Sequence, residues 1–219
     1  MMMKGQASVT LSEVSSRNMV DAGIGRLLVA SLHQGIADVA PVRLAFYENW
    51  LKPPGLHGGK FGLGPLHAVL SFLRLEGQTA YEQIMTRAGQ YTADWGHAQL
   101  SSLERATVRR LPPRLRARLA LYLSRRLVRD TFRGSRASTR LCRGTGTIQI
   151  RASIFCDVRT AADWHMCVFY SAAVERFLQR CDLDSRVAIN QCRASGGSQC
   201  TLTVIIRGHL AEQPAAEAA

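Results

Sequence analysis

Lysine is nearly absent from this sequence, and a long apolar run is absent altogether. Only three of its 219 residues are lysine, at positions 4, 52 and 60. The stretch nearest to a membrane span, residues 63–73, contains Gly64, Pro65 and His67 and falls short of the roughly 18 apolar residues that a span needs. The first residues also lack the apolar core and cleavage site of a secretory signal. We therefore expect no integral membrane segment and a cytoplasmic location, where the six cysteines are reduced.

Internal repeats and low-complexity segments are missing too. With 47% hydrophobic and 20% charged residues, the chain has the composition of an ordinary globular protein, which excludes disorder except at the ends. Its length is enough to bury a core without disulfide bonds. We expect a single domain over residues 18–209, a disordered or extended N-terminus over 1–17 and a flexible tail over 210–219.

The positive charge of the chain is concentrated in one arginine-rich block. Residues 105–143 hold thirteen arginines and one acid, Asp130, so this block accounts for the whole formal net charge of +12. Such a block attracts phosphate, carboxylate or an anionic membrane surface, and the forked guanidinium group suits carboxylates. Nucleic acid is the least favoured partner, because the block lacks the interleaved aromatic residues and glycines of single-strand binders and any groove-reading motif.

The same block predicts an amphipathic helix. Pro112-Pro113 suits a helix start, and leucines recur at helical spacing from Leu115 to Leu127. A neighbouring stripe carries Arg114, Arg118, Arg125 and Arg129. The arginines then face outward, either as a solvated basic face or as part of a site for an anionic ligand.

Periodicity elsewhere predicts an α+β fold whose first two thirds are helical. A small antiparallel sheet with a cysteine-bearing hairpin is expected near the C-terminus. Residues 52–65 hold three prolines and five glycines and are typical of a loop. The other expected helices are 18–36, 66–74, 79–100 and 160–180, and the expected strands are 147–151, 186–193 and 200–207.

Cysteines at the C-terminal hairpin form a candidate metal site. In the segment CRASGGSQC, Cys192 and Cys200 are symmetric about Gly196, so a turn centred there places their Cβ atoms about 5 Å apart. Cys167, on the preceding helix, supplies a third sulfur if that helix packs over the hairpin, and zinc suits such a site. Three buried cysteines that simply pack remain an open alternative, and a disulfide is disfavoured in a reducing compartment. The remaining cysteines, Cys142, Cys156 and Cys181, are expected to be packing residues.

The segment from Cys167 to Val204 resembles the 4-vinyl-reductase-like domain family. The resemblance rests on the aromatic pair Phe169-Tyr170, followed by a cysteine, a small residue two further on, a glycine four on and a second cysteine eight on. The resemblance is weaker from Leu66 to Arg151, where the sequence looks most like the bacteriochlorophyll branch of the family. Members of the family include a protein of bacteriochlorophyll synthesis, sensor domains of aromatic-responsive activators and, more distantly, vesicle-tethering TRAPP subunits.

The resemblance also implies a ligand set for zinc. The aromatic sensors of the family use a helix cysteine, two hairpin cysteines and a glutamate three residues before the first hairpin cysteine. By position these sulfur ligands correspond to Cys167, Cys192 and Cys200, while Ile189 stands where the glutamate belongs. This sequence therefore lacks the fourth ligand of the family's pattern, unless His165, Glu175, Asp182 or a water molecule takes its place.

Motifs for autonomous catalysis are missing. The chain has no GxGxxG, so we expect no nucleotide cofactor, and it has neither a nucleophile elbow nor an HExxH pair. We therefore expect binding rather than catalysis. Apolar pockets with a few placed polar groups bind small molecules, and the candidate lining residues are Tyr91, Trp95, Trp164, Phe169 and Tyr170, with Arg125 and Arg129 at the rim.

The leading interpretation is a binding protein for a hydrophobic aromatic ligand, such as a tetrapyrrole intermediate of bacteriochlorophyll synthesis. A planar ring with carboxylates matches aromatic walls and an arginine rim. One alternative is a stand-alone sensor of aromatic compounds that passes on ligand occupancy through homodimer contacts. Another is a vinyl reductase that takes electrons from a partner protein.

Overall fold

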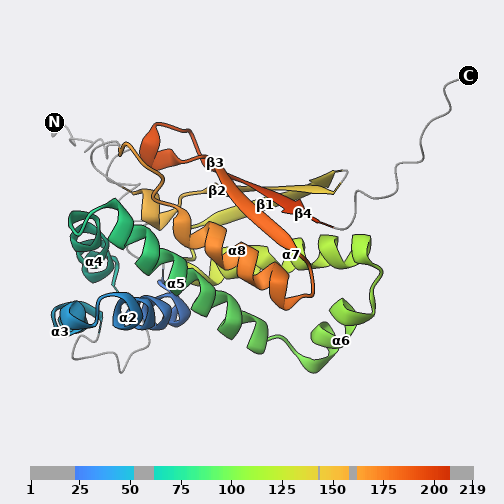
Figure 1. Ribbon diagram of the computed structural model, residues 1–219, viewed down its shortest axis with the longest axis horizontal. Helices are drawn as coiled ribbons and strands as arrows, with labels where there is room; N and C mark the ends of the chain where they lie inside the picture. The colour runs from blue at the N-terminus through green and yellow to red at the C-terminus, as the bar shows by residue number, and fades with distance from the viewer. Residues whose placement is uncertain (1–22, 52–61, 143, 158–161, 208–219) are drawn as a thin grey trace, which may run out of the picture.

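The computed structural model describes residues 23–51, 62–142, 144–157 and 162–207, and in it a helical region precedes a sheet (Figure 1). The α-helices of this part are α2 (Arg26–Val39), α3 (Leu44–Leu51), α4 (Leu63–Leu75), α5 (Gln78–Ala98), α6 (Ser102–Arg110), α7 (Pro113–Thr131) and α8 (Val168–Arg180). The strands are β1 (Arg136–Cys142), β2 (Thr145–Arg151), β3 (Ser185–Gln191) and β4 (Cys200–Ile206). Short 3₁₀ turns occur at η1 (Pro41–Arg43), η3 (Ile154–Cys156) and η4 (Arg193–Ser195). The predicted α+β class is confirmed.

Two hairpins form one antiparallel sheet. The strand order is β1-β2-β4-β3, so the second hairpin joins the first through β4 and β2. Alternation in β2 and β4 turns Ile148, Ile150, Leu202 and Val204 inward, whereas Gln149 lies on the exposed face. The sheet thus has one face to bury.

Helices α7 and α8 cover that face, and α5 lies behind α8 (Figure 1). α7 packs beside β1, α8 packs beside β3, and α5 contacts both α8 and α2. The core therefore lies between the sheet and the helical layer, with Phe155, Phe169 and Phe177 among its largest buried side chains. None of the helices in the described ranges is long and apolar enough to cross a bilayer.

Local sequence explains where several helices begin. Ser101 caps α6, since its side chain accepts a hydrogen bond from the backbone of Glu104 and the Glu104 carboxylate accepts one from the backbone of Ser101. Pro113 occupies the first turn of α7, as predicted from the Pro112-Pro113 pair.

Some predicted boundaries are wrong. The helix expected at 18–36 runs from Arg26 to Val39, and the helix expected at 160–180 begins only at Val168, because residues 162–167 form turns. β1 was not expected, since its arginine-rich sequence has little of the β-branched content typical of strands. The predicted terminal segments 1–17 and 210–219, and residues 52–61 of the predicted loop, lie outside the described residues.

Gly89 marks a tight approach between α5 and α8. A Cβ atom built on Gly89 would collide with the Phe169 carbonyl oxygen and lie 3.0 Å from the Ala173 nitrogen. Both are backbone atoms, so the helices must move apart to admit a methyl group. This glycine therefore sets the distance between α5 and α8.

We expect Gly89→Ala to lower the free energy of unfolding by about 1–3 kcal/mol, the usual cost of overpacking a core. Gly64→Ala is the matched control, because Gly64 lies in α4 and a Cβ there meets nothing within 4 Å. The control should be neutral or stabilising by up to about 1 kcal/mol, given the helix propensity of alanine. Urea unfolding measures both, and equal stabilities for the two variants would contradict the tight α5–α8 contact.

Candidate metal centre and arginine cleft

Four cysteines from separate parts of the chain meet beside the second hairpin. Cys156 ends η3, Cys167 directly precedes α8, Cys192 directly follows β3, and Cys200 begins β4. All four are buried, and their sulfur atoms lie within 4.8 Å of one another. The Cys156 sulfur is 3.4 Å from the sulfurs of both Cys192 and Cys200. The group is compact enough to hold one metal ion.

The hairpin brings its two cysteines together as the sequence predicts. Gln191 pairs with Thr201, so Cys192 and Cys200 are the next opposed positions of this register. The turn between them includes Gly196 at φ 92°, a left-handed conformation that favours glycine. The predicted turn centre at Gly196 is confirmed.

Cys156 is the cysteine that sequence reasoning missed. We expected it only to pack, since it has no informative spacing from the other cysteines. In the structure, Ile150 of β2 pairs with Cys200 of β4, so the chain leaving β2 passes beside the hairpin cysteines. The sequence does not reveal that β2 pairs with β4, and this pairing is what brings Cys156 to the other cysteines. Of the other two cysteines, Cys181 is buried away from the cluster and Cys142 is exposed.

The donor set suits a soft cation. Four thiolates in a buried, compact group match the ligands of tetrahedral sulfur sites. Hydrogen bonds from the other three cysteines hold the pKa of Cys192 below its ordinary value, whereas hydrogen bonds within the same group raise the pKa of Cys167. With Cys156 present, the group has four sulfur donors, so the glutamate that Ile189 replaces in the family's pattern is not needed as a ligand.

Buried aromatic rings lie next to the cluster. Phe155 packs against Phe169 and Tyr170, with ring centroids 4.6 and 5.0 Å apart. Trp164 packs edge-on against Tyr81, whose hydroxyl donates to the Met166 carbonyl at 2.9 Å. Three of the predicted ligand-lining residues, Trp164, Phe169 and Tyr170, thus lie near the cysteines, and the last two are fully buried.

The other two predicted aromatic residues lie elsewhere. Tyr91 and Trp95 pack together on α5, with centroids 5.3 Å apart. The Tyr91 hydroxyl donates to the Asp38 carboxylate at 2.7 Å, and Arg87 donates to the same carboxylate. This pair belongs to a surface network between α2 and α5, so the five predicted aromatic residues do not form one group.

The two predicted arginines line a surface cleft of about 230 Å³ between α7 and the start of β1, which we call the arginine cleft. The Arg125 guanidinium lies 5.4 Å from the centre of the Tyr122 ring and donates to the Ala137 carbonyl at 3.1 Å. The residues that line the arginine cleft are Tyr122, Arg125, Arg126, Arg129, Ser135, Arg136 and Ala137.

Two of the four arginines at the cleft are paired with acids, and the cleft keeps a net positive charge. Arg126 pairs with Glu104 at 2.9 Å, and Arg129 lies 3.6 Å from Asp130. The cleft also reaches toward the cluster, because the Ser135 hydroxyl is 3.3 Å from the Tyr170 hydroxyl. Four lining arginines against two neighbouring acids give the cleft a net positive charge, which favours anions over cations.

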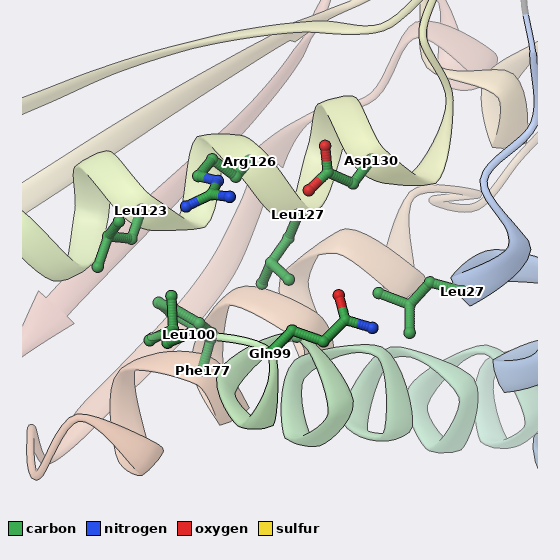
Figure 2. A pocket seen from close by; sticks show the side chains of 9 residues that line it. Leu27, Gln99, Leu100, Leu123, Arg126, Leu127, Asp130 and Phe177 are labelled. Carbon is green, nitrogen blue, oxygen red and sulfur yellow. The ribbon is translucent and has the colours of Figure 1, made fainter. Parts of the chain in front are cut away.

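A second hollow lies on another side of α7, between α7 and the end of α5 (Figure 2). Leu123 and Leu127 point into it from α7, and Leu100 and Phe177 line its opposite side. Its volume of about 30 Å³ admits one or two water molecules at most. It is too small for an organic ligand.

Comparisons with known proteins show the fold alone. No protein-family model matches the chain, and none of the curated proteins matches it. A trafficking protein particle complex subunit 3 from Naegleria fowleri, covalently bound to palmitic acid, is 11% identical with a TM-score of 0.50, covering 68% of this chain and 95% of that one. An H-NOX protein from Shewanella oneidensis in the Fe(II) ligation state is 10% identical with a TM-score of 0.54. The match covers 85% of this chain and 97% of that one. Another H-NOX structure, in the Fe(II)NO state, is 9% identical with a TM-score of 0.50. The match covers 84% of this chain and 99% of that one.

We expect Cys156→Ser to reduce the metal content of the purified protein to less than half that of the wild type, because it removes one of four sulfur donors. Cys181→Ser is the matched control, since Cys181 is also buried but lies outside the cluster. Elemental analysis measures the metal. A chelator should also lower the melting temperature of the wild type more than that of Cys156→Ser. Equal metal content in the wild type and Cys156→Ser would remove Cys156 from the ligand set.

Proposed function

We propose that this chain is a zinc-containing binding protein for a hydrophobic aromatic ligand with acidic groups, of the tetrapyrrole class. In this proposal the arginine cleft receives the acidic edge of the ligand. The chain holds or delivers the ligand, as a carrier or as an accessory to vinyl reduction.

The arginine cleft is the observation that carries the proposal. Its guanidinium groups match carboxylates in a two-pronged geometry, and the exposed ring of Tyr122 offers a flat apolar surface beside them. The cleft volume of about 230 Å³ is below the roughly 300–1,000 Å³ of pockets that enclose a drug-sized ligand. It is therefore too small to enclose a large flat molecule and would receive only one edge of it.

The fold supports the coarser part of the proposal, which is small-molecule binding. Solved structures of similar fold include a protein bound to palmitic acid and a protein in an Fe(II)NO ligation state. At 9–11% identity this likeness does not extend to the ligand. The tetrapyrrole class rests instead on the acidic, aromatic chemistry that the cleft favours.

Zinc is the metal that fits four cysteine thiolates best. Zn–S bonds of about 2.3 Å place tetrahedral sulfurs roughly 3.8 Å apart. The shortest sulfur separations here are 3.4 Å and the largest is at most 4.8 Å, which brackets that value. Because all four ligands come from the protein, zinc would connect η3, α8 and the hairpin rather than activate a substrate.

We expect the metal in the purified protein to be zinc, at about one ion per chain, since one tetrahedral centre holds one ion. Replacement by cobalt(II) should produce the visible absorption bands of tetrahedral cobalt with thiolate charge transfer. The Cys156→Ser variant should lose intensity in the charge-transfer band. A folded wild-type protein without zinc, and without these bands after cobalt is added, would show that the cysteines only pack.

We expect protoporphyrin IX to bind and quench tryptophan fluorescence, and the variant Arg125→Glu/Arg129→Glu to weaken this binding at least about tenfold. Hydrogen bonds to charged groups contribute about 1.5–3 kcal/mol each, so reversing two arginines removes most of the attraction for carboxylates. The dimethyl ester of the same porphyrin lacks the acids and should bind both proteins equally.

The matched control is Arg43→Glu/Arg110→Glu, which makes the same change of charge at two exposed residues outside the cleft and outside the cysteine hairpin. This control should bind protoporphyrin IX like the wild type. If no porphyrin binds and a neutral phenol binds equally to wild type and Arg125→Glu/Arg129→Glu, the sensor alternative replaces the proposal.

A further inference from the structure

Helix α7 has a buried half and an exposed half. Its buried half packs on the sheet and α8 and consists of Ala117, Ala120, Leu121, Leu123, Ser124, Leu127, Val128 and Thr131. At about 100° per residue, six exposed residues fall together in one arc of roughly 100° on the opposite side. We call this arc the outer face of α7, and it consists of Arg114, Leu115, Arg118, Tyr122, Arg125 and Arg129.

The outer face of α7 combines charge with exposed apolar surface. It carries four arginines, of which Arg129 lies 3.6 Å from the Asp130 carboxylate at the edge of the arc. Among them, Leu115 is 48% exposed and Tyr122 is 57% exposed, about two helical turns further along. The helix has 19 residues and is therefore about 28 Å long, so the arginines are spread along a nearly straight line.

We propose that the outer face of α7 binds the surface of an anionic lipid membrane. Basic residues close to an anionic membrane surface are attracted to it, and Leu115 and Tyr122 add exposed apolar surface on the same face. Guanidinium groups pair with lipid phosphates, while the apolar stems of arginine lie along the acyl boundary. A tyrosine ring suits the headgroup level, where one end is apolar and the other is hydrated.

Leu115 favours a membrane over a nucleic acid. A phosphate backbone offers an aliphatic side chain no partner, and an exposed leucine gains nothing from it. At a lipid interface the same side chain leaves water. The face therefore fits a surface that is both negative and apolar below its headgroups.

Membrane binding is separable from ligand binding. Arg114, Leu115 and Arg118 do not line the arginine cleft, whereas Arg125 and Arg129 do. Variants at the first group thus change the outer face and leave the cleft intact. The inference stands whether or not the cleft takes a tetrapyrrole.

The test is co-sedimentation of the full chain with unilamellar vesicles. The wild type should sediment with vesicles of phosphatidylcholine mixed with phosphatidylglycerol and stay in solution with phosphatidylcholine alone. Raising the salt from about 0.1 to about 0.5 M should release most of the bound protein, because the screening length shortens. Arg114→Glu/Arg118→Glu should weaken partitioning at least about 25-fold, since each basic residue near an anionic surface contributes about fivefold.

Two controls separate charge from position. Arg43→Glu/Arg193→Glu makes the same change of charge away from α7 and should sediment like the wild type. Leu115→Ser should reduce binding without changing the charge, whereas Leu75→Ser, at an even more exposed leucine of α4, should not. Circular dichroism confirms that each variant is folded, and protoporphyrin binding should be the same in wild type and Arg114→Glu/Arg118→Glu.

Three results would overturn the inference. The first is equal sedimentation with neutral and anionic vesicles, and the second is unchanged sedimentation of a folded Arg114→Glu/Arg118→Glu variant. The third is failure to bind vesicles together with tight binding of an oligonucleotide that depends on Arg114 and Arg118 but not on Leu115. That outcome would assign the face to nucleic acid.

Discussion

The convergence of four sulfur atoms brings together separate segments of the C-terminal half of the molecule. It joins the end of η3, the start of α8 and both sides of the second hairpin, so the sheet and its covering helix share one fixed point. Because α8 also packs tightly on α5 at Gly89, the position of the helical layer follows from the same point. A metal ion there would stabilise a junction between layers rather than a single loop.

Short-range sequence patterns predicted the hairpin turn and helix α7, which depend on residues close together in the chain. The symmetry of Cys192 and Cys200 about Gly196 identified the turn, and the leucine spacing after Pro112-Pro113 identified α7. Cys156 escaped prediction because its position depends on the pairing of β2 with β4, which no local pattern encodes. β1 escaped because its place at the sheet edge beside α7 overrides a composition with little strand propensity.

The predicted ligand residues divide in space for a similar reason. Tyr91 and Trp95 share a helix face with residues that contact α2, whereas Phe169 and Tyr170 face the core at the start of α8. Sequence spacing indicates a shared helix face but not which neighbour that face meets. The arginines of α7 form a third group, and Ser135 connects this group to Tyr170 through adjacent hydroxyls.

The spacing of the cysteines along the chain has a consequence for the role of a bound metal ion. Cys156 and Cys200 are 44 positions apart, and α8 and β3 lie between them. A contact between residues so far apart in sequence depends on tertiary structure and not on a local turn. A metal ion bound by the four thiols would therefore stabilise a tertiary arrangement that core packing and strand pairing have already built.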